Sequence, residues 1–132
     1  MVDLSICITT YNLEKYLEET LRSVFNQQTT YSYEVLIGDD GSTDKTIEII
    51  KEWKRKYPEI IKYFIMDREN NKKYDHIIRA SSNRYNLLKN AVGRYITFLD
   101  GDDFYIDSNK IEKQINILDK NLDCNLPVSI FL

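Results

Sequence analysis

Three aspartates stand together directly after an apolar segment of the chain. Tyr95–Leu99 is rich in β-forming residues and leads into Asp100, Asp102 and Asp103. A short apolar run of this kind predicts a buried strand, and the acids are expected outside the core because an uncompensated buried charge is costly. Carboxylate oxygens are ligands that Mg²⁺ and Mn²⁺ prefer, whereas aspartate and glycine also favour plain polar turns. The segment is therefore either a cation site or a turn.

Two further polar segments follow predicted strands. The strand Tyr33–Ile37 runs into a second acidic segment with Asp39 and Asp40, and the strand Leu4–Thr10 runs into a Thr-Thr-Tyr-Asn turn at Thr9–Asn12. Strands that alternate with helices predict a mostly parallel α/β sheet with helices on both faces. In such a sheet the C-terminal ends of the strands share one edge, and ligands bind outside it. We therefore expect the three segments to converge, which favours a binding site over a turn.

The other elements are expected from apolar periodicity and from helix stop signals. They are, in order, a helix with Asn12 as its N-cap that reaches Gln28, a helix with Ile47–Trp53 on its buried side, a strand at Ile60–Met66, an irregular loop at Asp67–Arg79, a short helix capped by Ser81 or Ser82, a helix with Ile111–Leu118, and a strand at Pro127–Leu132. No repeat or linker interrupts this series, so residues 1–132 are predicted to form a single domain.

Composition and charge exclude several classes of protein. The formal net charge is −3, so there is no overall positive field for nucleic acid. The two cysteines, Cys7 and Cys124, form neither a disulfide framework nor a metal-binding spacing. No apolar run is long enough for a membrane span, and the N-terminus lacks the features of a secretory signal. We therefore expect a cytoplasmic protein, either soluble or peripheral to the inner face of the membrane.

Three kinds of chemistry fit carboxylates above a parallel sheet. A divalent cation there could carry a diphosphate, an acid such as Asp40 could accept a hydrogen bond from a base or a sugar hydroxyl, or an acid could accept a phosphoryl group as in receiver domains. A receiver has an acid pair after its first strand, where this chain has Thr-Thr-Tyr-Asn, and the third-strand acid, Asp67, opens a long loop here. The sequence has neither a GxxxxGK phosphate loop nor a GxGxxG after the first strand, which argues against P-loop NTPases and Rossmann dehydrogenases.

Four motifs in series resemble the family 2 glycosyltransferases of the GT-A fold. They are Ser-Ile-Cys-Ile-Thr-Thr-Tyr-Asn at residues 5–12, Leu-Arg-Ser-Val at 21–24, Tyr-Glu-Val-Leu-Ile-Gly-Asp-Asp-Gly-Ser-Thr-Asp at 33–44, and Ala-Val-Gly-Arg-Tyr-Ile-Thr-Phe-Leu-Asp-Gly-Asp-Asp at 91–103. The likeness extends from about Leu4 to about Leu118. It implies a Rossmann-like transferase that depends on a nucleotide sugar and on Mn²⁺ or Mg²⁺, with a UDP-sugar as the family's usual donor.

The resemblance also implies roles for individual residues. The family's DxD motif falls on Asp100, Gly101 and Asp102, so Asp100 would meet the ribose and Asp102 the metal ion and the diphosphate. Asp40 would hydrogen-bond the base, usually uracil. Arg84 matches an arginine of the family's Arg-Asn-x-Gly segment, although the Asn and Gly are not in register here. The residues implied to bind the nucleotide sugar are Thr9, Thr10, Tyr11, Asn12, Asp39, Asp40, Arg84, Asp100 and Gly101.

Members of this family continue past the point where the sequence ends, with the acceptor site and the general base of inverting transfer. No acid of this chain is a candidate for that base, so it is expected beyond Leu132. The chain is therefore interpreted as the truncated, donor-binding part of a longer enzyme that acts on a glycan, lipid or protein acceptor, and as inactive in transfer by itself. The alternatives are a module that binds a nucleotide sugar without turning it over and a receiver-like domain. An uncovered sheet edge would also favour self-association.

Overall fold

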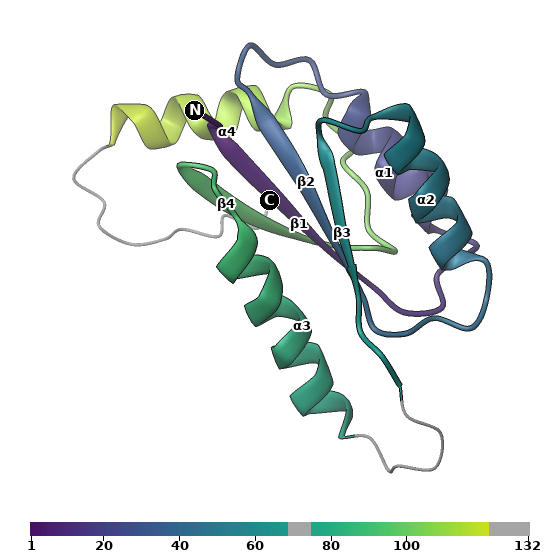
Figure 1. The fold of residues 1–132 in the computed structure, drawn as a ribbon. Helices are drawn as coiled ribbons and strands as arrows, with labels where there is room; N and C mark the ends of the chain where they lie inside the picture. The colour runs from purple at the N-terminus through teal and green to yellow at the C-terminus, as the bar shows by residue number, and fades with distance from the viewer. Residues whose placement is uncertain (69–74, 122–132) are drawn as a thin grey trace.

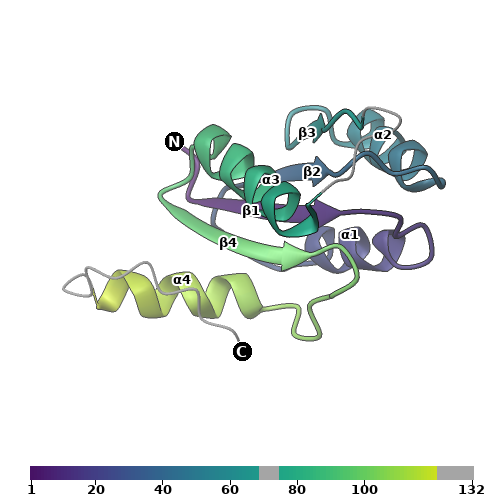
Figure 2. The ribbon, with the colours of Figure 1, turned by 90° about the horizontal axis from the view of Figure 1, so that it is seen from below.

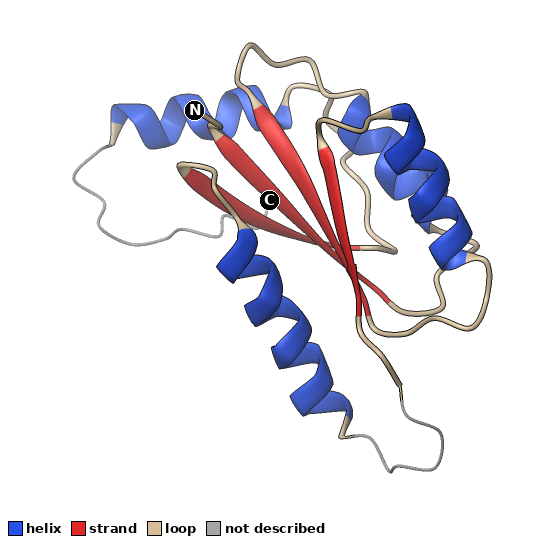
Figure 3. Cartoon of the chain, in the orientation of Figure 1, coloured by secondary structure: helices blue, strands red, loops and turns tan. Residues whose placement is uncertain are grey.

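The computed structural model describes residues 1–68 and 75–121, which form a four-stranded sheet and four helices. The elements are β1 (Leu4–Thr10), α1 (Leu17–Phe25), β2 (Tyr33–Asp39), α2 (Thr46–Lys56), β3 (Ile61–Ile65), α3 (His76–Asn90), β4 (Tyr95–Asp100) and α4 (Lys110–Lys120). All paired strands are parallel, in the order β3-β2-β1-β4 (Figure 1, Figure 3). The parallel α/β architecture predicted from the sequence is confirmed.

Helices cover both faces of the sheet, as Figure 2 shows for α3 on one side and α1 and α4 on the other. Successive side chains of a strand point to opposite faces. Ile6 and Ile8 of β1 therefore join the main core, to which α1, α2 and α4 contribute. Cys7 and Leu36 point the other way and pack against Leu87 of α3. Burial on both faces explains why the strands read as continuous apolar runs.

The start of α1 differs from the sequence-based prediction. The helix begins at Leu17 rather than next to Asn12, and Leu13 lies in the loop before it. Asn12 adopts the left-handed backbone conformation, with φ of 50°, and its side-chain oxygen accepts a hydrogen bond from the loop after β2. Because this oxygen is bonded to the loop after β2, it does not cap α1.

The start of α3 also differs from the prediction. The helix begins at His76, and the carboxylate of Asp75 caps it by accepting hydrogen bonds from two backbone N–H groups of the first turn. Ser81 and Ser82, which were predicted as caps, lie inside the helix. Apolar periodicity is weak in α3 because Ile77, Ile78 and Tyr85 are exposed while the polar Asn83 is buried.

Three expectations concern the edges of the described structure. The predicted strand Pro127–Leu132 and Cys124 lie outside the described residues. Among the described strands, β4 lies at an edge of the sheet, and Ile96 on it is 39% exposed. Self-association through this edge stays a prediction. None of the helices in the described part of the chain has the length and apolar character that crossing a membrane requires.

Candidate functional site

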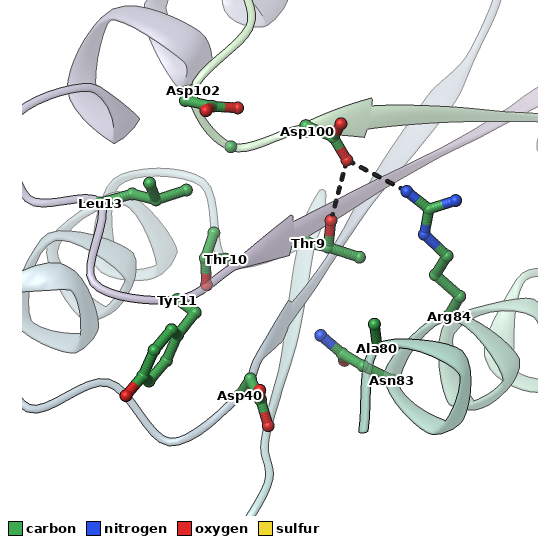
Figure 4. Close-up of a pocket in the computed structure, with 11 residues that line it drawn as sticks. Thr9, Thr10, Tyr11, Leu13, Asp40, Ala80, Asn83, Arg84, Asp100 and Asp102 are labelled. Carbon is green, nitrogen blue, oxygen red and sulfur yellow. Dashed lines mark hydrogen bonds and ion pairs between the residues drawn. The ribbon is translucent and has the colours of Figure 1, made fainter. Parts of the chain in front are cut away.

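A cavity of about 360 Å³ opens at the C-terminal edge of the sheet, where β1, β2 and β4 end and α3 forms the facing wall (Figure 4). Its lining residues are Thr9, Thr10, Tyr11, Leu13, Asp40, Ala80, Asn83, Arg84, Asp100, Gly101 and Asp102. The sequence-based set of site residues is therefore largely gathered on one cavity. Asn12 and Asp39 are the members of that set that do not line it.

Strand register brings the three polar segments together. Thr9 of β1 pairs with Asp100 of β4, and the backbone N–H of Gly101 donates to the Thr9 carbonyl at 2.9 Å. On the other side of β1, the backbone N–H of Asp40 donates to the Thr10 carbonyl at 2.9 Å. The loops after β2 and β4 are thus both tied to the end of β1. They converge at one edge, as the alternation of strands and helices predicts.

Asp39 is fully buried and serves the loop that follows it. One carboxylate oxygen accepts hydrogen bonds from the hydroxyls of Thr10 (2.7 Å) and Ser42 (2.6 Å). The other accepts from the backbone N–H groups of Gly41 (3.0 Å) and Ser42 (2.7 Å). Gly41 adopts φ of 79°, a conformation that glycine tolerates without strain. Asp39 therefore shapes the turn that presents Asp40 to the cavity, and a direct contact of Asp39 with a nucleotide stays a prediction.

Asn12 joins the loop after β1 to the loop after β2. Its backbone N–H donates to the Ser42 hydroxyl at 2.9 Å, and its side-chain oxygen accepts from the backbone N–H of Thr43 at 2.8 Å. These contacts fix the position of the neighbouring Tyr11, whose ring lines the cavity. The role that the structure gives Asn12 is to hold the cavity wall in shape, and its contact with a nucleotide likewise stays a prediction.

Two arginines hold Asp40. One carboxylate oxygen accepts from Nε of Arg79 at 2.6 Å, and the other accepts from Arg68 Nη2 at 2.8 Å. Nε of Arg68 also donates to the Asp40 carbonyl oxygen at 2.6 Å. The guanidinium of Arg68 lies over the ring of Tyr11, with its central carbon 4.1 Å from the ring centroid. Asp40, which is implied to bind a base, is therefore charge-paired at the end of the cavity where Tyr11 lies.

Asp100 lies at the opposite end of the cavity and is more open. One of its oxygens accepts from the Thr9 hydroxyl at 3.2 Å and from Arg84 Nη2 at 3.3 Å (Figure 4). The side chains of Asp100 and Arg84 are each 53% exposed, so this ion pair is weak in water. Both groups can therefore exchange this contact for a ligand at little cost.

Asp100, Asp102 and Asp103 form an exposed carboxylate cluster beside the cavity. One oxygen from each lies within 4.8 Å of the others. Three hard oxygen ligands on one side, with the other side open to solvent, fit Mg²⁺ or Mn²⁺, which keep several waters and take one or two protein carboxylates. The donor set therefore suits a divalent cation, with Asp102 as the ligand that the sequence predicts.

Of the α3 residues that line the cavity, sequence reasoning predicted Arg84 but missed Ala80 and Asn83. Asn83 is 3% exposed, and its side-chain Nδ2 donates to the Gly38 carbonyl at 2.9 Å. Ala80 lies one turn before it and also lines the cavity. A spacing of three to four residues from Ala80 through Asn83 and Arg84 to Leu87 marks one helix face. That spacing could have identified these residues if α3 had been predicted to start before Ser81.

Comparison with known families finds the model "Glycosyl transferase family 2", which matches residues 5–130. Among curated proteins, an uncharacterized glycosyltransferase of Haemophilus influenzae is 37% identical over 118 residues, covering 89% of this chain and 43% of that protein. A poly(ribitol-phosphate) beta-glucosyltransferase of Bacillus spizizenii is 33% identical over 119 residues, covering 89% of this chain and 17% of that protein. The chain thus spans less than half the length of these relatives.

Solved structures agree on the fold. TarS (residues 1–349) of S. aureus, crystallised with UDP-GlcNAc, superposes with a TM-score of 0.73 at 27% identity, covering 92% of this chain and 32% of TarS. A mannosyltransferase of Pyrobaculum calidifontis, in complex with GDP-Man and Mn²⁺, superposes with a TM-score of 0.71 at 20% identity, covering 87% of this chain and 32% of that one. This second likeness concerns the fold alone.

Proposed function

The chain belongs to glycosyl transferase family 2, and we propose that its cavity binds a nucleotide-diphosphate sugar, specifically a UDP-sugar, together with a divalent cation. The whole protein, of which this chain is the donor-binding part, transfers the sugar to a glycan or lipid acceptor with inversion. UDP-GlcNAc bound to TarS and the glucosyltransferase among the relatives support this donor class and a glycan acceptor. The family match also favours this function over the receiver-like alternative.

The convergence of three strand ends on one cavity is the observation that supports this function most directly. A nucleotide-diphosphate sugar is long, with an aromatic base at one end and an anionic diphosphate further along, before the sugar. The cavity has a matching division, with Tyr11 and Asp40 at one end and the carboxylates around Asp102 at the other (Figure 4). Asp100, which accepts a hydrogen bond from Thr9, lies at the same end as Asp102. The base would lie beside Tyr11 and Asp40, and the ribose and the diphosphate would lie toward Asp100 and Asp102.

The residues around the cavity would have different tasks in catalysis. Tyr11 offers an aromatic face to the base, and the carboxylate of Asp100 accepts a hydrogen bond from a ribose hydroxyl. Asp102 holds the cation, which neutralises charge on the departing diphosphate when bound. The half-exposed guanidinium of Arg84 can leave Asp100 for a phosphate oxygen, an anion that it binds well. These groups bind and orient the donor, and activation of the acceptor hydroxyl falls to a base elsewhere in the whole protein.

Titration calorimetry of UDP with and without Mn²⁺ tests the donor site. We expect binding that strengthens with the metal, and we expect Asp102→Asn to weaken metal-assisted binding by about tenfold or more, because each tenfold loss requires only about 1.4 kcal/mol. Glu52→Gln is a matched control, since it removes the same charge from an exposed position on α2. Absence of UDP binding would refute the donor site. Equal binding by the Asp102 variant would refute the cation role.

A second measurement separates an enzyme from a binding module. The chain and a longer form that includes the residues following Leu132 in the gene, where these exist, are incubated with UDP-GlcNAc and a poly(ribitol-phosphate) acceptor. If only the longer form transfers the sugar, the general base that activates the acceptor hydroxyl lies outside this chain. Binding of UDP-GlcNAc without transfer by either form supports the binding-module alternative instead.

A further inference from the structure

The motif Leu-Arg-Ser-Val at residues 21–24 lies in α1, and none of its residues lines the cavity. Three polar side chains in and just after α1, those of Thr20, Ser23 and Gln27, follow one another at spacings of three and four residues. Such a spacing places side chains on one face of a helix. All three contact the backbone of residues 101–111, the segment after β4. This face of α1 therefore meets the segment that begins with the glycine of the DxD motif.

Ser23 and Gln27 hold the later part of the segment after β4. The Ser23 hydroxyl accepts a hydrogen bond from the backbone N–H of Tyr105 at 3.0 Å. Gln27 donates through Nε2 to the Asp107 carbonyl at 2.8 Å and accepts at Oε1 from the backbone N–H of Ile111 at 3.1 Å. These contacts fix the segment on α1, but they lie beyond the three carboxylates in the sequence.

Thr20 meets the segment between two of the carboxylates. Its hydroxyl donates to the Gly101 carbonyl at 2.8 Å, which is shorter than its 3.3 Å contact with the Tyr16 carbonyl one helical turn earlier. A hydroxyl has a single proton, so the shorter contact is the stronger hydrogen bond. The backbone N–H of Gly101 donates to the Thr9 carbonyl at 2.9 Å. Gly101, which is buried, is therefore held by β1 at its donor and by α1 at its acceptor.

These two hydrogen bonds orient both peptide groups that flank Gly101. Its N–H belongs to the peptide shared with Asp100, and its carbonyl belongs to the peptide shared with Asp102. Because a peptide group is planar, one hydrogen bond on each sets the direction of the backbone at the two acids. One oxygen each of Asp100, Asp102 and Asp103 lies within 4.8 Å of the others, although like charges repel. A turn that was free to rotate would relieve this repulsion by moving the acids apart.

We propose that Thr20 is a positioning residue for the cation: its hydroxyl holds the Gly101 carbonyl so that Asp100 and Asp102 face the same side and share one divalent ion. The inference rests on the proposed function, because it takes a divalent cation as the ligand of these acids. Thr20 is 1% exposed and does not line the cavity, so it acts through the turn and does not contact the ligand. Removal of a group that orients metal ligands in this way lowers metal affinity by about 10–100-fold.

Thr20→Val tests the proposal, because valine has nearly the shape of threonine and lacks the hydroxyl. Titration calorimetry gives the Kd of UDP without metal and at a fixed Mn²⁺ concentration, and the ratio of the two Kd values measures the contribution of the cation. We expect Thr20→Val to lower this ratio by about tenfold and to leave the metal-free Kd unchanged. Thr20→Ser keeps the hydroxyl and should restore the ratio. Ser23→Ala is the matched control, since it removes a hydroxyl from the same face of α1 but not from Gly101, and its ratio should equal that of the unmodified chain.

A measurement on the unmodified chain makes the test independent of how the variants fold. If the hydrogen bond from Thr20 favours cation binding, cation binding must stabilise that hydrogen bond by the same factor. In NMR spectra the Thr20 hydroxyl proton should therefore exchange with solvent about tenfold more slowly with UDP and saturating Mg²⁺, a diamagnetic ion, than with UDP alone. The buried Ser5 hydroxyl, which donates to Glu34 at 2.6 Å near the other end of β1, is the internal control and should not change.

The outcomes separate this inference from the proposed function. An equal Mn²⁺ effect in Thr20→Val and the unmodified chain, an equal loss of it in Thr20→Val and Ser23→Ala, or an unchanged exchange rate of the Thr20 proton would overturn the inference and leave the proposed function intact. If UDP binds the unmodified chain and Mn²⁺ does not strengthen that binding, the cation role fails and this inference fails with it. Absence of UDP binding by the unmodified chain would overturn the donor site as well.

Discussion

Gly38 of β2 and Asn83 of α3 make a close contact between the sheet and the helix that walls the cavity. Asn83 Nδ2 donates to the Gly38 carbonyl at 2.9 Å. A Cβ atom added at Gly38 would lie 2.1 Å from Oδ1 of Asn83 and 3.2 Å from Cδ1 of Leu87. Both side chains are buried, so neither can swing into solvent. Gly38→Ala therefore requires α3 to move away from β2.

The magnitude follows from two terms. Overpacking a close-fitting site costs about 1–3 kcal/mol, and loss of the hydrogen bond from Asn83 to the Gly38 carbonyl adds about 0.5–1.5 kcal/mol. We expect Gly38→Ala to lower the free energy of unfolding by about 2–4 kcal/mol, measured by urea titration with circular dichroism. Because Ala80 and Arg84 move with α3, UDP binding should weaken as well.

Asn83→Ala tells whether this contact is the cause. Among the described residues, Oδ1 of Asn83 is buried without a hydrogen-bond partner, so truncation removes one favourable bond and one unsatisfied acceptor, and the net cost should be about 1 kcal/mol or less. The double variant Gly38→Ala/Asn83→Ala should then be more stable than Gly38→Ala alone, with a coupling of about 1 kcal/mol or more. Additive costs would refute the reasoning, because they would mean that the added methyl group and the Asn83 amide do not meet.

Two further predictions concern buried carboxylates. Asp39→Asn should lower the melting temperature measured by calorimetry and cost about 2–4 kcal/mol, because an amide cannot accept all the hydrogen bonds that converge on Asp39; a variant as stable as the parent would contradict this. Burial raises the pKa of Glu34, but hydrogen bonds from Ser5, Val92 and Lys62 outweigh it and hold that pKa below its usual value. The stabilisation by Glu34 is therefore complete above the ordinary glutamate pKa of about 4.3 and is lost as the pH falls through the lower, folded-state value. Urea titrations from neutral pH to about pH 3 should show a smaller acid-induced loss for Glu34→Gln than for the parent, and equal losses would contradict the assignment.

The sequence predicts the sheet and the convergence of its polar loops because both depend on short apolar runs and on topology. β1, β2 and β4 are each an apolar run followed at once by polar residues, and parallel pairing then forces their ends to one edge. Helix starts are harder to predict, because a side chain that could cap a helix can instead form a hydrogen bond with a group far away in the sequence. Asn12 binds Thr43, 31 residues away, rather than its own helix. The acid that does cap α3 is Asp75, in a charged segment without apolar periodicity.

Neighbouring aspartates with the same chemistry could not be separated by the sequence alone. Asp39 continues the face of β2 that carries Val35 and Ile37 and is buried with them. Asp40 follows the strand and reaches the cavity. Strand parity predicts that the two acids point to opposite sides, but only the structure tells which of them reaches the cavity. The residues around Asp40 in the sequence do not indicate that Arg68 and Arg79 bind it, because these arginines lie 28 and 39 residues further along the chain.

The three groups of acids at the sheet edge differ in what already satisfies them, and this decides what each can bind. Asp39 is enclosed by hydroxyl and backbone donors, so it is part of the fold. Asp40 is neutralised by two guanidinium groups, which suits a site for an uncharged base better than a site for a cation. Asp102 and its neighbours are exposed and close to one another, so their mutual repulsion is relieved when a divalent cation binds. The charge pattern around the cavity thus runs in the same direction as the proposed donor, from base to metal-bound diphosphate.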